Sequence, residues 1–333
     1  MGTSYNAAET AATVTRPVVA AVRQPARARV HRKSARWLPV IRPAGACDPL
    51  RDALAHEVIV AKAAARLLGP KGARLAPRVL AVEDGIIVSE WLDGHETLHA
   101  LLERSEAGEA QRADHWGTAL ALLHGASRPT LPPAMSAIPR PWEMTPQIMT
   151  SLPAAGLEIV ARLQTIAGIP EALDELAATA PSAVFVHGDA KLDNAMWGPR
   201  GELRLVDWEL GGLGDSRWDL GSALGDYLAR WIASAQIERG RSLRAWMTTA
   251  KTTRSCATLG ARAVLDGYER TSGQHVDRRG VARYVGVFFL HRAQAWGERA
   301  GRLGARATLL AAAGERLIMR PQHLDSLLAP HGR

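Results

Sequence analysis

The segment VHGDAKLDN at residues 186–194, followed by VDWE at residues 206–209, carries most of the information about fold and chemistry in this chain. It places a carboxylate, an ammonium, an amide and a second carboxylate on two tight turns that are separated by one short hairpin. Transfer of a phosphoryl group needs a group that orients the attacking hydroxyl, oxygen ligands for Mg²⁺, and positive charge near the moving phosphoryl group. Because the segment offers all three, it predicts a phosphoryl-transfer centre.

The residues on either side of this segment predict two different kinds of structure. Before Gly94 we expect a short hairpin within residues 27–40 that turns near Lys33 and Ser34, a strand over 35–42, a helix over 50–68, and strands over 78–82 and 85–91. After Gly94 the pattern is mainly helical, over 97–104, 110–123, 157–166 and 170–179 and again from residue 218 onward. A buried strand at 183–186 and a hairpin of 195–197 with 203–206 frame the two polar turns. The chain is therefore expected to be α+β and to divide into two lobes.

The composition is that of an ordinary globular chain with an uneven charge. The 333 residues carry a net charge of +8, and no apolar run approaches the roughly 18 residues of a membrane span. Residues 2–15 lack the apolar core of a secretory signal, and Cys47 and Cys256 form no metal-ligand cluster, so we expect a reduced, cytoplasmic protein.

The positive charge is concentrated at the start of the chain. Residues 1–36 hold seven basic side chains against Glu9, a net charge of +6. This arm is expected to be either a solvated segment or a contact for an acidic peptide or partner. No aromatic residues alternate with the basic ones in a way that would predict nucleic-acid binding, and no membrane contact is expected.

The order of these motifs resembles the aminoglycoside phosphotransferase and choline kinase group, whose fold is a bilobal relative of the protein kinases. The resemblance covers residues 35–225 and depends on VIR at 40–42, HE at 56–57, SEWLDG at 89–94, the two polar turns, and GDSRWDL at 214–220. Residues 1–24 are expected to form a weakly ordered basic arm, and the resemblance implies a nucleotide-binding N-lobe of sheet plus helix over 25–93 and a larger, mainly helical C-lobe over 94–333. The C-lobe would hold the catalytic loop and the substrate.

The resemblance also implies roles for individual residues. Asp189 is expected to be the catalytic aspartate that orients the substrate hydroxyl, and His187 to be a structural member of its loop. Asn194 and Asp207 are expected to hold Mg²⁺, which prefers few protein oxygens together with phosphate oxygens, and Asp219 is expected to brace the loop from the next helix. ATP would be held by the following residues: Arg42 at its phosphates, Glu57 paired with that cation, and Glu90, Trp91 and Leu92 as the hinge beside adenine.

The spacing of Asp189, Lys191 and Asn194 is that of serine/threonine kinase catalytic loops, D-x-K-x-x-N. An ammonium two residues beyond the catalytic aspartate reaches the γ-phosphate and neutralises charge that develops there, so Lys191 is predicted to be catalytic. The stretch DWELGGLGDSRWDLGS at 207–222 also resembles small lanthipeptide-type kinases that phosphorylate Ser or Thr of ribosomally made precursor peptides. In those systems a separate lyase then eliminates the phosphate.

Two departures from the family pattern leave alternatives open. No glycine-rich loop precedes residue 42, and Arg42 occupies the place expected for a lysine. Arginine is not interchangeable with a lysine at such a site. These departures leave two alternatives: a partner protein that completes the nucleotide site, and a catalytically silent pseudokinase that acts as a scaffold.

The acceptor is the least determined part of the interpretation. Aminoglycosides are polycations, and a sequence pI near 10.1 disfavours them. The favoured acceptor is Ser or Thr of a biosynthetic precursor peptide, with a partner lyase, and the alternative is an antibiotic or another small alcohol.

Overall fold

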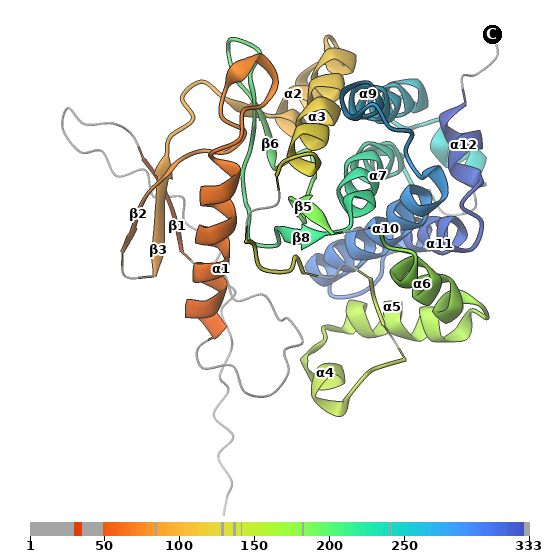
Figure 1. Cartoon of the computed structure of the whole chain (residues 1–333). Helices are drawn as coiled ribbons and strands as arrows, with labels where there is room; N and C mark the ends of the chain where they lie inside the picture. Colours follow the sequence, from red (N-terminus) through yellow and green to blue (C-terminus); the bar gives the residue numbers. More distant parts are fainter. Residues whose placement is uncertain are drawn as a thin grey trace, which may run out of the picture.

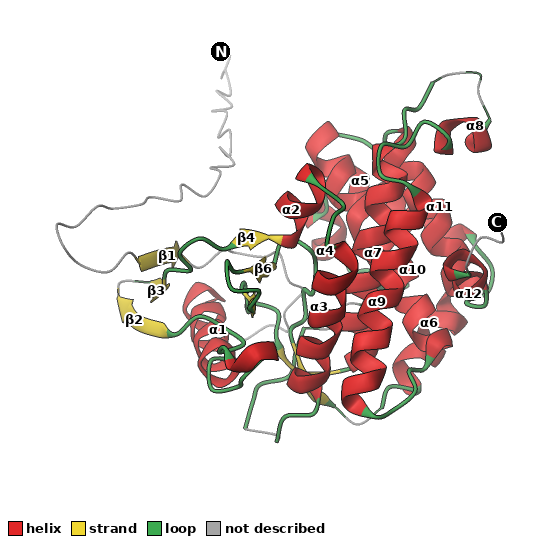
Figure 2. Ribbon diagram, turned by 90° about the horizontal axis from the view of Figure 1, so that it is seen from above, coloured by secondary structure: helices red, strands yellow, loops and turns green. Residues whose placement is uncertain are grey.

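The computed structural model describes residues 30–34, 49–83, 85–127, 130–135, 138–140, 142–181, 183–238, 240 and 242–329. These residues form a small lobe of sheet and helix followed by a larger, mainly helical lobe (Figures 1 and 2). The α+β, two-lobed organisation expected from the sequence is confirmed. The expected basic arm at 1–24 and the expected strand at 35–42, which includes Arg42, lie outside the described residues.

The small lobe is a three-stranded antiparallel sheet beside one long helix (Figure 1). The strands are β1 (Val30–Ser34), β2 (Val79–Glu83) and β3 (Ile86–Glu90), in the spatial order β1-β3-β2. Helix α1 (Pro49–Ala64) contacts β2 and β3, and the short 3₁₀ helix η1 (Pro70–Gly72) follows it. The helix and the β2–β3 hairpin agree with the sequence prediction.

The predicted turn at Lys33 and Ser34 is wrong. Both residues lie inside β1, opposite Ile87 and Ile86 of β3. A hairpin prediction uses only local turn signals, whereas β1 obtains its ladder hydrogen bonds from a strand far along the chain. The strand alternates its side chains between the two faces of the sheet, so His31 and Lys33 share one face.

The large lobe is a set of helices packed around one hydrophobic core that includes Trp116, Tyr227 and Phe289. Helix α3 packs on α9, α10 packs on α11 and α7, and α7 packs on α9. The helices are α2 (Leu98–Arg104), α3 (Glu109–His124), α4 (Pro146–Ser151), α5 (Ala154–Thr165), α6 (Ile169–Ala178), α7 (Ser216–Ser234), α8 (Leu243–Met247), α9 (Arg254–Ser272), α10 (Arg278–Ala300), α11 (Ala305–Met319) and α12 (His323–Leu328). The helical prediction beyond Gly94 is thus confirmed.

Two glycines bring α3 and α9 into backbone contact. A Cβ atom on Gly117 would lie 1.9 Å from the carbonyl oxygen of Val264, and one on Gly267 would lie 2.2 Å from that of Asp114. Only glycine fits at these positions. This tight pair supports α7, which carries the acidic residues Asp219 and Asp226 described below.

Two small sheets connect the lobes to the polar turns. Strand β4 (Glu96–Thr97) pairs with β6 (Ala195–Trp197), which pairs with β7 (Leu203–Leu205), while β5 (Val184–Val186) pairs with β8 (Gly212–Gly214). The predicted strand at 183–186 and the predicted hairpin that follows it are confirmed.

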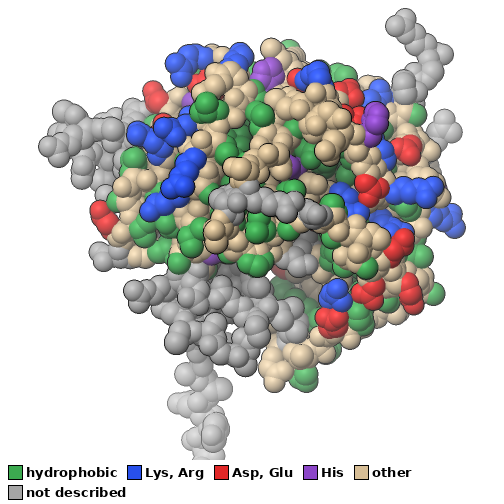
Figure 3. All heavy atoms as spheres, in the orientation of Figure 1, with side chains coloured by type: hydrophobic (Ala, Val, Ile, Leu, Met, Phe, Trp, Pro, Cys, Tyr) green, Lys and Arg blue, Asp and Glu red, His purple; other side chains and the backbone are tan. Residues whose placement is uncertain are grey.

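The surface carries both signs of charge. In Figure 3, Lys and Arg side chains are spread over the visible face of the molecule with Asp and Glu side chains between them. Among the described residues, no helix is both long and apolar enough to cross a lipid bilayer.

Candidate active site

The strand order brings the two polar turns side by side. The loop at 187–194 joins β5 to β6, and the loop at 206–211 joins β7 to β8. Because β6 pairs with β7 and β5 pairs with β8, both loops leave the same ends of their sheets. The backbone N–H of Val206 donates to the carbonyl oxygen of Asn194 at 3.0 Å and joins the loops directly.

His187 is a structural link between the two loops. Its side chain is fully buried. The backbone N–H of Asp189 donates to its Nδ1 atom at 3.2 Å, and its Nε2 atom lies 2.9 Å from the carbonyl oxygen of Val206. A carbonyl only accepts, so the proton sits on Nε2 and Nδ1 is an acceptor. With both ring nitrogens used in this way, His187 has the structural role that the sequence predicted.

Asp219 braces the first loop from α7, as expected. Its carboxylate accepts the backbone N–H groups of His187 at 2.7 Å and Gly188 at 2.9 Å, and it lies 3.1 Å from Nε2 of His124. Trp218 donates its indole N–H to the carbonyl oxygen of Gly188 at 2.7 Å. Although burial disfavours the charged form, these hydrogen bonds and His124 hold the pKa of Asp219 below its usual value.

Gly188 is the position in this loop where a side chain cannot be accommodated. Its φ of 80° lies in the left-handed region, and a Cβ there would sit 2.3 Å from the carbonyl oxygen of Leu210. The absence of a side chain lets the two loops approach each other closely.

Asp189, Lys191 and Asn194 converge on one carboxylate. Lys191 Nζ and Asn194 Nδ2 both donate to Oδ2 of Asp189, the second at 2.9 Å, and Asn194 Nδ2 also donates to the backbone carbonyl oxygen of Asp189 at 2.9 Å. The three residues that the sequence predicted to act together are in direct contact.

The electrostatics of Asp189 and Lys191 favour a basic carboxylate beside a permanent cation. Burial raises the pKa of the Asp189 carboxyl, and the neighbouring Lys191 ammonium opposes this rise only in part. Burial disfavours the charge on Lys191 as well, but the Asp189 carboxylate raises the pKa of that ammonium above its usual value. Asp189 is therefore a better proton acceptor than an exposed aspartate.

A second cluster surrounds Lys33 of β1. Its ammonium donates to Glu57 of α1 at 2.9 Å, to Glu209 at 2.9 Å, and to Asp207 between them. The strand, the helix and the second loop thus supply one cation and three carboxyl groups. The sequence predicted that Glu57 pairs with Arg42, which lies outside the described residues; in the structure Glu57 pairs with Lys33.

Lys33 and Asp207 favour each other's charged form, whereas burial raises the pKa of Glu57 above its usual value. Burial disfavours the ammonium, but Asp207, Glu57 and Glu209 together raise the pKa of Lys33 well above its usual value. Burial likewise disfavours the Asp207 carboxylate, but Lys33 lowers its pKa below the usual range. Asp207 has a left-handed backbone, with φ of 70°, which is uncommon outside glycine and occurs more often for aspartate than for most residues.

Of the remaining predicted nucleotide contacts, Glu90, Trp91 and Leu92 lie among the described residues and Arg42 does not. Arg42 lies outside the described residues, so its role stays a prediction. Glu90 ends β3, but its carboxylate accepts from Arg204 at 3.1 Å and from the backbone N–H of Arg78 at 3.1 Å. Trp91 and Leu92 follow it in the connection to the large lobe, and the hinge role of these three residues stays a prediction.

Sequence reasoning did not assign Lys33 and Glu209 to the site. The available signal for Lys33 was its rarity, because the chain has only five lysines, Lys33, Lys62, Lys71, Lys191 and Lys251. Glu209 stands in the quoted VDWE motif, but nothing local shows that it faces a strand of the small lobe.

A family model decides the classification of the chain. The model described as "Phosphotransferase enzyme family" matches residues 18–250. The chain belongs to this family. The phosphotransferase is therefore an ATP-dependent kinase with an alcohol group as acceptor, and the phosphoryl-transfer chemistry and protein-kinase-like fold predicted from its loops are confirmed. None of the curated proteins matches it.

The phosphotransferase also has similar solved structures. A choline/ethanolamine kinase family protein from Mesorhizobium loti is 20% identical, with 83% of each chain covered and a TM-score of 0.49. Choline kinase LicA from Streptococcus pneumoniae is 14% identical, with 89% of this chain and 88% of that one covered and a TM-score of 0.47. An aminoglycoside-3'-phosphotransferase of type VIII is 18% identical, with 78% and 85% covered and a TM-score of 0.48.

Proposed function

We propose that this phosphotransferase transfers the γ-phosphoryl group of Mg-ATP to a hydroxyl group held beside Asp189. The observation that carries the proposal is the convergence of two clusters across two adjoining loops. Asp189, Lys191 and Asn194 form one cluster, and Lys33, Glu57 and Asp207 form the other. Phosphoryl transfer depends mainly on positioning and charge stabilisation, and these groups supply both.

On the nucleotide side, Lys33 is placed to bind the phosphates. Its pairing with Glu57 and Glu209 fixes the ammonium on the side of the small lobe that meets the second loop. The backbone groups of Trp91 and Leu92 would meet the adenine. The pairing also removes one argument for a silent pseudokinase, since the role first assigned to Arg42 no longer depends on an arginine.

The residues fit Mg²⁺ in number and kind. Both amide hydrogens of Asn194 point toward Asp189, which leaves its Oδ1 as the atom for a metal, and Lys33 occupies only Oδ1 of Asp207. The described residues contain no group of three or more His, Cys, Asp or Glu side chains that would hold a metal alone. One carboxylate and one amide, completed by phosphate oxygens and water, suit Mg²⁺. When bound, the ion would neutralise charge on the transferred phosphoryl group.

On the acceptor side, Asp189 would align the hydroxyl and accept its proton. Lys191, which Asp189 holds close to that point, would neutralise charge on the moving phosphoryl group. The direction of the Asp189 pKa, above its usual value, suits a proton acceptor.

The acceptor class remains a choice between two candidates. Ser or Thr of a precursor peptide, with a partner lyase, is favoured by the Lys191 spacing and by an open cavity of about 1280 Å³ beside the catalytic loop. That volume exceeds the roughly 300–1,000 Å³ of ordinary small-molecule sites. A small alcohol is the second candidate, supported by membership of the phosphotransferase family.

The test is mass spectrometry of acceptor pools incubated with the purified protein and Mg-ATP. Peptides that contain Ser or Thr and a set of small alcohols, aminoglycosides included, form the two pools. We expect a mass increase of one phosphoryl group that requires Mg²⁺ and disappears in Asp189→Ala. If no acceptor gains mass and ATP is not consumed with either pool, the proposed reaction is wrong.

A further inference from the structure

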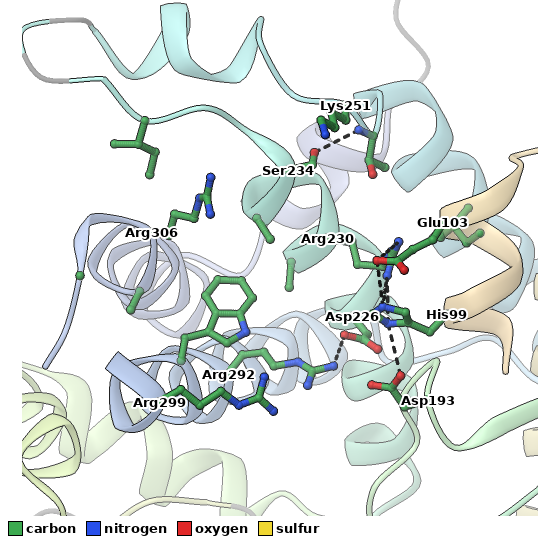
Figure 4. A pocket seen from close by; sticks show the side chains of 18 of the residues that line it. His99, Glu103, Asp193, Asp226, Arg230, Ser234, Lys251, Arg292, Arg299 and Arg306 are labelled. Carbon is green, nitrogen blue, oxygen red and sulfur yellow. Dashed lines mark hydrogen bonds and ion pairs between the residues drawn. The ribbon is translucent and has the colours of Figure 1, made fainter. Parts of the chain in front are cut away.

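A large cavity opens beside the catalytic loop, on the side of the C-lobe (Figure 4). It has a volume of about 1280 Å³ and is bounded by α2, α7, α10 and the start of α11, with Asp193 of the catalytic loop at its edge. Asp193 lies between Leu192 and the proposed metal ligand Asn194. A molecule in this cavity is therefore next to the groups that would carry out the transfer.

A chain of contacts joins the cavity to the catalytic loop. Arg292 of α10 donates to Oδ1 of Asp226 at 2.5 Å (Figure 4). Oδ2 of the same carboxylate accepts the backbone N–H of Leu192 at 2.9 Å. The Asp226 carboxylate is buried, with 2% of its side chain exposed. The wall of the cavity and the loop that holds Asp189 are thus joined through the Asp226 carboxylate.

The carboxylates of the cavity are already engaged. Besides Asp226, Asp193 lies 3.3 Å from Nδ1 of His99, and Glu103 lies 3.2 Å from Nε2 of His99 and 3.8 Å from Arg230. Glu106 lies beside the Cys256 thiol, whose pKa is raised by burial and by this carboxylate. Asp226, Asp193 and Glu103 thus have partners within the protein, which weakens their attraction for a cationic ligand.

Several cations of the cavity have no such partner. Within the described part of the chain, Lys251, Arg299 and Arg306 make no ion pair with any carboxylate, and Arg306 donates only to the carbonyl oxygen of Ala235 at 3.1 Å. Figure 4 shows them around the cavity on three segments: the connection before α9, the end of α10 and the start of α11. Arg230 and Arg292 add two half-buried guanidinium groups deeper inside.

We propose that this cavity binds an acceptor that carries carboxylate or phosphate groups, with Lys251, Arg299 and Arg306 as its anion-binding residues. The proposal rests on the proposed function, because it names the substrate class of that same site. Unpaired cations on converging walls attract anions and repel polycations such as aminoglycosides. Exposed charges interact over about 10 Å at 0.1 M salt, which is enough to span such a cavity.

The anionic group has two possible sources, and both provide the same chemistry. It belongs either to Asp or Glu residues next to Ser or Thr in an acidic peptide, or to a small alcohol with a carboxylate or phosphate of its own. The experiment has one arm for each source.

The first measurement is binding, which does not depend on turnover. Fluorescence anisotropy with the full-length protein compares two labelled peptides. In one, Glu residues flank a Ser, and in the other, Lys residues flank it. We expect the acidic peptide to bind or, if the ligand is a small alcohol, glycerol 3-phosphate to bind in a separate calorimetric titration, and the binding to weaken as salt rises. Equal or tighter binding of the basic peptide overturns the proposal, as does failure of both acidic probes to bind.

The matched variants locate the binding. In the triple variant Lys251→Gln, Arg299→Gln, Arg306→Gln, the dissociation constant of the acidic probe should rise about tenfold or more, given the usual strength of exposed charge pairs. Arg320→Gln removes one exposed charge after α11, outside the cavity, and should change nothing. If the triple variant binds the acidic probe as tightly as the wild type, the anion is held elsewhere and the proposal is wrong.

Phosphoryl transfer then separates this proposal from the one it rests on. With Mg-ATP, kcat/KM should be higher for the acidic peptide or glycerol 3-phosphate than for the basic peptide, choline or an aminoglycoside. Selective binding without any transfer or ATP consumption contradicts the proposed reaction and leaves the anion site standing. Efficient transfer to a cationic acceptor confirms the reaction and overturns the anion site.

Discussion

The clusters around Asp189 and Lys33 are built from different kinds of information. Asp189, Lys191 and Asn194 lie within six consecutive residues of one loop, and a carboxylate and an ammonium nearly balance each other. Lys33, Glu57, Asp207 and Glu209 come from a strand, a helix and a second loop, and three carboxyl groups surround one ammonium. The local cluster is suited to handle the acceptor proton, whereas the assembled cluster has spare negative charge for a divalent cation.

The largest effect is expected in the local cluster. Asp189→Ala should lower kcat by about 10³-fold, within the range that general acid–base catalysis contributes. The steady-state rate of ADP formation with an established acceptor is the measurement, and circular dichroism checks the fold. Unchanged turnover would return Asp189 to a structural role.

Lys33 and Arg42 offer a direct contrast in the assembled cluster. Lys33→Ala should lower kcat/KM for ATP by about 10²-fold, because it removes the cation that Glu57 and Asp207 hold. Arg42→Ala should have a much smaller effect, and Lys62→Ala, an exposed lysine on α1, serves as the control. A larger loss in Arg42→Ala than in Lys33→Ala would restore the prediction made from the sequence.

Lys191 should affect turnover more than nucleotide binding. Lys191→Ala removes the ammonium beside Asp189 and is expected to lower kcat about tenfold to a hundredfold with little change in ATP affinity. Isothermal titration with a non-hydrolysable ATP analogue, alongside kcat, separates the two quantities. Wild-type turnover in this variant would mean that Lys191 is only a neighbour of the site.

Asp219, which braces the loop of the local cluster from α7, should contribute to the stability of the fold. Asp219→Ala leaves the buried N–H groups of His187 and Gly188 without an acceptor, so we expect the free energy of unfolding to fall by about 2 kcal/mol. Urea denaturation measures this, and Asp325→Ala, which replaces an acidic residue of α12 outside the site, is the comparison. A loss below about 0.5 kcal/mol would show that other contacts hold the loop.

The smallest effect concerns pH. Because the folded-state pKa of Asp219 is depressed, its carboxylate contributes stability above the unfolded-state pKa of about 4, and this contribution is lost as the pH falls toward the lower folded value. As the pH falls below about 4, the free energy of unfolding of the wild-type protein should therefore decrease more steeply than that of Asp219→Asn. Parallel curves of unfolding free energy against pH would contradict this assignment.

Local patterns predicted the parts of the fold that depend on neighbours in sequence. Helix α1, the β2–β3 hairpin and the strands that frame the two loops were predicted within a few residues. The turn assigned to Lys33 and Ser34 was wrong, since the pairing of β1 with β3 is a long-range contact. The same long-range contact kept Lys33 and Glu209 out of the predicted site.

The cations of the cavity could not be predicted from local sequence patterns either. Lys251, Arg299 and Arg306 lie on three segments, and nothing in their local sequence distinguishes them from solvated surface charges. Their significance depends on which carboxylates face them, and that depends on how α7, α10 and α11 pack.

The amino-acid sequence by itself determined the family, the phosphoryl-transfer chemistry and the Asp189–Lys191–Asn194 cluster, because tight loops place residues two to five positions apart within reach of one another. Only the tertiary structure decided which cation pairs with Glu57, how Asp219 and His187 hold the loops, and where the unpaired charges of the cavity gather. Those contacts join residues that are distant in the chain, and their geometry is set by packing of the whole molecule rather than by any local pattern.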